Sequence, residues 1–181
     1  MLDHQLLTAK AAPGRIAVML LAALLLAACV QSDKPLLTGT KPVLGDQFQL
    51  NLFDDFTDGK ADTVRTAVFR WNTSRYVLVS GDLLDVKYLV AQPLDDSNSL
   101  LQLGNDKEYA YLLSRKLAEG TYRILPVNEK DLDAAAQKQN CVTQQGEICT
   151  IATRQQLDTF VHASLGKTIP YTMMAVISAV K

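Results

Sequence analysis

Short runs of β-favouring residues, separated by turn signals, dominate the middle of this 181-residue chain. The first run has apolar residues at every second position, Phe48, Leu50 and Leu52, with polar residues between them. This period of two predicts a strand with one buried and one exposed face. Similar runs follow at a regular spacing that is typical of an antiparallel sandwich, a barrel or a strongly curved sheet.

Two hairpins are predicted where β-rich runs flank short polar turns. In the first hairpin, strands at 66–71 and 76–80 flank a turn at 72–75. In the second, strands at 108–115 and 121–127 flank a turn at 117–120. Shorter strands are expected at 87–91, which Pro93 stops, and at 100–103. The total is six or seven strands.

Helix-favouring residues replace the β-rich runs after position 128. Residues 129–139 are rich in Ala, Lys, Gln, Asp and Glu, and Asn128 is suited to cap them as a helix. A second helix is predicted from the capping-box pattern of Thr153 and Gln156 to Gly166. Its apolar residues share one face: Leu157, Phe160, Val161 and Leu165.

The last segment, residues 170–180, is apolar and is interpreted as a final buried strand, with a loose apolar tail as the alternative. The expected fold class is therefore α+β. It is mainly antiparallel β, with two hairpins and six or seven strands, and it has one or two helices toward the C-terminus.

The first 28 residues have the layout of an export signal. Lys10 and Arg15 are the only Lys or Arg residues before position 29, and no charge interrupts residues 16–28. A basic flank before an apolar run of about a dozen residues is typical of a secretory signal. The run is short for a membrane span, which needs about 20 apolar residues.

The run ends in Leu26, Ala27, Ala28 and Cys29, and this ending resembles the lipobox of bacterial lipoproteins. The resemblance implies that signal peptidase II cuts between Ala28 and Cys29. It also implies that the Cys29 thiol carries a diacylglyceryl group and that the new amine is acylated, which makes a stable membrane anchor. A plain signal peptide or an uncleaved anchor is the alternative.

Val30 follows the cysteine, where members of this class that stay at the inner membrane favour Asp. The resemblance therefore implies the outer membrane, with the domain facing the periplasm. The expected organisation is a signal peptide at 1–28, a lipidated tether at 29–42 and a single periplasmic domain at 43–181. The mature part resembles exported lipoproteins of proteobacteria, although no motif after Cys29 points to a named family.

Once Cys29 is assigned to lipid, Cys141 and Cys149 remain as an even pair in an oxidising compartment. A structural disulfide is expected between them. Folding the segment symmetrically places the two cysteines opposite each other in a hairpin whose turn is 144–146. A thioredoxin-like site needs two intervening residues, and a zinc site needs further ligands that the mature chain lacks.

Candidate catalytic or metal-binding groups are few. His162 is the single histidine of the mature chain and falls on the predicted last helix, so His-dependent triads and zinc centres are not expected. The acidic loop 54–62 does not fit a calcium helix-loop-helix motif, because its third and twelfth positions are Phe56 and Arg65. A solvated turn is the favoured interpretation, with a looser cation site as the alternative.

Two other groups of residues have both a structural and a functional interpretation. The acidic segments 80–85 and 95–98 contain carboxylates that acid–base catalysis could use, but Asp is common in turns after strands. Six aromatic residues on predicted strands could form a face for a glycan or peptide, although packing explains them. These are Trp71, Tyr76, Tyr88, Tyr109, Tyr111 and Tyr122.

The chain has no nucleophile elbow, phosphate-binding loop, dinucleotide fingerprint or HExxH metal motif, and no cofactor is expected. Its formal charge of −1, without a basic patch, argues against nucleic acid as a partner. We therefore expect a membrane-anchored envelope lipoprotein with a non-enzymatic structural or protein-interaction role, whose partner is another envelope protein. The alternatives are a periplasmic module that binds a small ligand or glycan, and a hydrolase that uses carboxylates.

Overall fold

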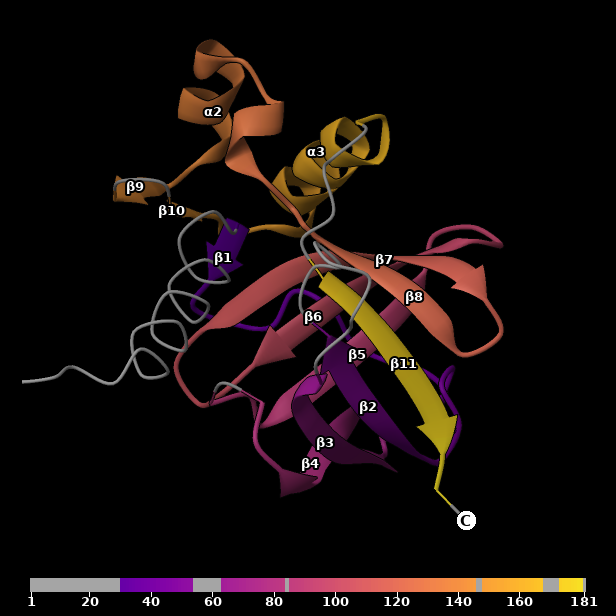
Figure 1. Ribbon diagram of the computed structural model, residues 1–181. Helices are drawn as coiled ribbons and strands as arrows, with labels where there is room; N and C mark the ends of the chain where they lie inside the picture. The colour runs from indigo at the N-terminus through magenta and orange to yellow at the C-terminus, as the bar shows by residue number, and fades with distance from the viewer. Residues whose placement is uncertain (1–29, 54–62, 84, 146–147, 168–172, 181) are drawn as a thin grey trace, which may run out of the picture.

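The centre of the molecule is a closed antiparallel barrel of eight strands (Figure 1). The structure is a computed structural model that describes residues 30–53, 63–83, 85–145, 148–167 and 173–180. The barrel strands are β2 (Gln47–Phe53), β3 (Thr63–Asn72), β4 (Arg75–Gly81), β5 (Tyr88–Pro93), β6 (Asn98–Gly104), β7 (Tyr109–Ala118), β8 (Thr121–Pro126) and β11 (Met173–Ala179).

Strands β2 to β8 follow one another around the barrel, each antiparallel to the next. The final strand β11 completes the circle between β8 and β2, with Ala175 opposite both Tyr122 and Leu52. The last segment of the chain is thus a strand, as the sequence favoured. The predicted class, mainly antiparallel β with helices near the C-terminus, is confirmed. The barrel has eight strands, one more than the six or seven predicted from the sequence.

The alternating strand directions give the barrel two ends. The turns β3–β4, β5–β6 and β7–β8 and the C-terminal end of β11 lie at one of them, which we call the hairpin end. The connections β4–β5 and β6–β7 and the last residue of β8 lie at the opposite end. This arrangement decides which loops surround each opening of the barrel.

Strands β6, β7 and β8 are buried on both faces. Their neighbouring apolar residues are Leu100 and Leu101, Leu112 and Leu113, and Ile124 and Leu125. One member of each pair belongs to the cluster inside the barrel, and the other belongs to a second cluster outside the wall. The sequences of these strands therefore contain continuous apolar runs. In β2, by contrast, buried and half-buried residues alternate.

The helix α3 (Arg154–Leu165) covers the outer wall of these strands (Figure 1). Leu157, Phe160 and Val161 are buried on its inner face. The predicted capping box at its start is present, and the helix ends before Gly166 as expected. Burial of this apolar face, more than helix propensity, keeps the helix folded.

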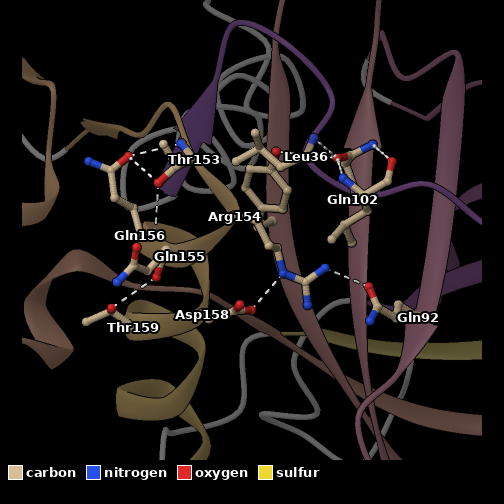
Figure 2. A network of polar contacts seen from close by, with 11 residues as sticks. Leu36, Gln92, Gln102, Thr153, Arg154, Gln155, Gln156, Asp158 and Thr159 are labelled. Atoms are coloured by element: carbon tan, nitrogen blue, oxygen red, sulfur yellow. Dashed lines mark hydrogen bonds and ion pairs between the residues drawn. The ribbon is translucent and has the colours of Figure 1, made fainter.

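Arg154 fastens the start of α3 to the barrel (Figure 2). Its Nη1 donates a hydrogen bond to Gln92 Oε1 of β5 over 2.8 Å, and its Nε pairs with Asp158 Oδ1 at 2.7 Å. The guanidinium thus contacts the sheet and its own helix at once, which fixes the angle at which α3 lies.

Two short helices replace the single helix predicted after Asn128. They are the 3₁₀ helix η1 (Glu129–Asp131) and the α-helix α2 (Ala134–Asn140). The side chains of Asn128 and Asp133 each accept a hydrogen bond from a backbone N–H and so cap one helix each. The second cap, with extended backbone at Leu132, interrupts the helix that composition alone predicts.

Cys141 and Cys149 form the expected disulfide, with their Cα atoms 5.3 Å apart. The predicted symmetrical hairpin is wrong, because β9 (Thr143–Gln145) and β10 (Ile148–Thr150) pair with Gln144 opposite Cys149. Cys141 is the C-cap of α2 and precedes the strand. The disulfide therefore joins a helix end to a buried strand.

The beginning of the described chain is packed against the barrel and is not the free tether expected from its sequence. The strand β1 (Val30–Ser32) lies between β7 and β10. Farther along, Gln102 Oε1 accepts hydrogen bonds from the backbone N–H groups of Leu36 and Leu37, both over 2.8 Å (Figure 2). Burial of Val30 and Leu37 in the outer cluster explains the difference.

Several predictions fall on residues that lie outside the described part of the chain. They are the export signal at 1–28 with Ala28, the lipid-bearing Cys29 and the acidic loop 54–62. Among the described residues, no helix is both long enough and apolar enough to cross a membrane.

Candidate functional site

The interior of the barrel contains a cavity of about 230 Å³. Its wall is built from inward-facing strand residues, most of them apolar. The leucines of the strands that line it are Leu50, Leu52, Leu89, Leu101, Leu103 and Leu112. Eight-stranded barrels have an interior that side chains can just fill, so an open volume depends on which residues point inward.

Small residues at inward positions leave this space. Ala91 stands opposite Leu101, and Ala175 stands opposite Leu52, so one member of each pair is small. In a third pair, Ser99 of β6 and Ser114 of β7, both members are small. All these residues line the cavity.

The cavity opens at the hairpin end. Its exposed lining residues are there: Asp95, Asp96 and Ser97 in the β5–β6 turn, and Lys116 on β7. At the opposite end the cavity is lined by apolar residues, Leu83, which is 3% exposed, and the half-buried Val86. A ligand would therefore enter past a polar rim into an apolar interior, which is the usual design of small-molecule sites.

Tyr76 holds the segment that borders the cavity beside β3 and β4. The backbone N–H of Leu44 donates a hydrogen bond to the Tyr76 hydroxyl over 2.8 Å. The Tyr76 ring meets Phe48 and Trp71 edge to face, with centroids 4.9 Å and 5.0 Å away. Burial raises the pKa of the Tyr76 hydroxyl, and the hydrogen bond from Leu44 opposes this only in part.

The inward-facing polar side chains of β6 and β7 gather near the mouth. Ser99 lies directly across from Ser114, and Lys116 lies two residues farther along β7 on the same face. Ser114 is only 5% exposed. Lys116 Nζ pairs with Glu119 Oε2 at 2.8 Å, and this hydrogen bond raises the pKa of Lys116.

Asp95 is occupied within its own turn. Its Oδ1 accepts hydrogen bonds from the backbone N–H groups of Ser97 and Asn98, each over 2.8 Å. The Asn98 side-chain amide donates to Oδ1 and Oδ2. The Asn98 side chain, followed by these backbone groups, lowers the pKa of Asp95. The segment 95–98 is thus a turn, as its sequence favoured.

The other candidate residues from the sequence do not meet at the cavity. Asp82 pairs with Arg65 at 2.7 Å in the turn after β4, and Asp85 has a positive φ of 66° in the same connection. His162 is exposed on α3. Within the described ranges, no cluster of three or more His, Cys, Asp or Glu side chains could hold a metal ion.

The six aromatic residues all lie on strands, as predicted, but they do not share a face. Tyr76 is buried inside the barrel, whereas Tyr111 is buried outside it and shares a 2.6 Å hydrogen bond with Ser32. Tyr122 lines the cavity, and Tyr88 lies under the Arg75 guanidinium. Packing therefore accounts for most of them.

No family model, curated protein or solved structure matches the chain. Sequence reasoning did not find the cavity. The sequence feature that indicates it is the occurrence of Ala and Ser at strand positions whose neighbours on the same face are Leu. This feature indicates a cavity only when the strands are known to form a closed barrel.

Proposed function

We propose that this domain binds one small apolar ligand inside its barrel and serves as a ligand-binding module of the cell envelope. The observation that carries the proposal is the apolar cavity with a polar mouth at the hairpin end. It favours the ligand-binding alternative over a purely structural role. An interaction with an envelope protein stays a separate prediction, and anchoring through Cys29 is supported by the lipobox alone.

The volume of the cavity limits the size of the ligand. The cavity has a volume of about 230 Å³. An engineered apolar cavity of roughly 150 Å³ is large enough for benzene. By this comparison a hydrocarbon chain of about eight carbons is of suitable size.

A chain-length series tests the proposal. Linear alcohols of six to twelve carbons would compete with an environment-sensitive fluorescent probe for the purified full chain. Each buried methylene contributes about 0.8 kcal/mol, which is about a fourfold gain in affinity. The affinity should rise in such steps to about eight or nine carbons and then level off, because longer tails no longer fit.

A filled cavity provides the matched control. Ala91→Leu adds a large side chain inside the barrel, whereas Ala135→Leu makes the same change at an exposed position of α2. We expect at least a tenfold loss of affinity in the first variant and no change in the second. Thermal unfolding would verify that both are folded. Equal binding by both variants, or no binding by the unmodified chain, would refute the proposal.

A further inference from the structure

Two serines and a lysine on neighbouring strands line one wall of the mainly apolar cavity. The hydroxyls of Ser99 and Ser114 belong to directly opposed residues of β6 and β7, and the Lys116 amine follows on the same face. Opposed residues of an antiparallel pair have Cβ atoms about 5 Å apart, and alternate residues are about 7 Å apart. One small polar group can therefore reach all three.

The two serine hydroxyls are not used by the fold. Within the described part of the chain, no other residue is hydrogen-bonded to either of them, and Ser114 is 5% exposed. A hydroxyl in apolar surroundings is unfavourable unless it gains a partner. Because Ser99 and Ser114 line the cavity and neither hydroxyl has a partner among the described residues, both hydroxyls are available to a polar atom that enters from the mouth.

Lys116 gives a singly charged anion a partner at a mouth whose other charged side chains are carboxylates. Lys116 is the cation of the cavity wall, and its partner Glu119 is 94% exposed, so the ligand replaces a weak surface ion pair. The Asp95 oxygens are occupied by their own turn. Asp96 and Glu119 remain nearby as anions and disfavour a head group with two negative charges.

We propose that the ligand is a single-chain carboxylic acid of about eight carbons, whose carboxylate is bound by Ser99, Ser114 and Lys116. The carboxylate accepts hydrogen bonds from the two hydroxyls and the amine, and the tail extends toward Leu83 at the opposite end of the barrel. This inference rests on the proposed function and adds the chemical class of the head group. It assigns Lys116 and the two serines as binding residues.

Four ligands with the same tail separate the head group from the apolar contribution. Octanoate, octanol, octylammonium and octyl phosphate would each be titrated into the full chain at pH 7.5. We expect octanoate to bind at least tenfold more tightly than octylammonium and octyl phosphate, with octanol between them. The shared tail keeps the apolar contribution to binding constant. Differences in affinity among the four ligands therefore come from the contacts of the head group at the mouth.

Variants test the individual residues. Lys116→Met keeps the aliphatic stem and removes the charge, so octanoate affinity should fall at least tenfold while octanol affinity changes less than twofold. Lys116→Arg should restore most of the octanoate affinity. Ser114→Ala should lower it at least threefold. Lys138→Met, at an exposed position of α2, is the control and should have no effect.

The outcomes distinguish the two proposals. If octanol binds but octanoate is not preferred over octylammonium, or if Lys116→Met binds octanoate unchanged, the carboxylate assignment is wrong and the apolar site stands. Tightest binding of octyl phosphate would also overturn it, in favour of a phosphate head group. If none of the four ligands binds, both proposals fail.

Discussion

At the scale of single residues, buried polar groups tie irregular segments to the barrel. Tyr76 does so for the segment at Leu44, and Gln102 does so for Leu36 and Leu37. Each bond satisfies backbone N–H groups that belong to no strand or helix. Such contacts hold the loops beside the barrel in one place, which a cavity with a defined mouth requires.

Tyr76→Phe should reduce the free energy of unfolding by about 1 kcal/mol at pH 7, because the Leu44 N–H loses its partner. The raised pKa of Tyr76 means that the folded state favours the protonated hydroxyl. This contribution is complete below the unfolded pKa of about 10 and is lost as the pH rises through the folded pKa.

Urea unfolding at pH 7 and at pH 11 would measure both effects. The unmodified chain should lose more stability between these pH values than Tyr76→Phe, which has no hydroxyl to ionise. Tyr109→Phe, at a half-buried position, is the control for a lost hydroxyl. An equal alkaline loss in Tyr76→Phe and the unmodified chain would contradict the assignment.

At the scale of elements, the described helices and short strands between β8 and β11 form a layer outside the barrel. α3 packs on the wall of β5 to β8, and the disulfide connects α2 to β10, which in turn pairs with β1. The cavity and the disulfide are thus on different sides of the same wall. Changes to one should have little effect on the other.

Reduction of the disulfide should lower the free energy of unfolding, because the disulfide restricts the unfolded chain. The loop that it closes is short, so the expected loss is only about 2–3 kcal/mol. Denaturant unfolding with and without reductant would measure this without changing any side-chain volume. Cys141→Ala is the control and should be insensitive to reductant. Ligand affinity should stay within twofold after reduction, and a larger change would show that the outer layer is coupled to the cavity.

The strands and the last helix could be predicted because their signals are local. The alternation at Phe48, Leu50 and Leu52 and the capping box at Thr153 each depend on residues within a few positions. The register of the strand that contains Cys149 could not be predicted, since β10 pairs with β1, whose residues are more than a hundred positions away. The disulfide itself follows from the number of cysteines, but its place at a helix end does not.

At the scale of the whole molecule, the N-terminal end of the described chain is close to the barrel. The Val30 backbone N–H donates to Val127 O over 3.1 Å, and the Val30 side chain is fully buried. Cys29 directly precedes Val30 in the sequence. An anchor on Cys29 would therefore hold the domain close to the membrane, with little free chain between them.

Native protein extracted from membranes should begin at Cys29 and carry acyl chains, which intact-mass spectrometry would detect. Cys29→Ser should abolish both the lipid and the cleavage by signal peptidase II, so the variant should keep its leader. Cys141→Ala is the matched cysteine control and should be lipidated normally. An uncut leader or an unmodified thiol on the native protein would contradict the lipoprotein assignment.

The sequence by itself determined the properties that depend on neighbouring residues: the strands, the capped helix and the turn at Asp95. The tertiary structure decided the rest. Only closure of the barrel by β11 brings Ala175 beside Leu52 and encloses the cavity that Ser99, Ser114 and Lys116 line. A cavity is a property of enclosed volume, and its walls come from strands that no local pattern can place around a common centre.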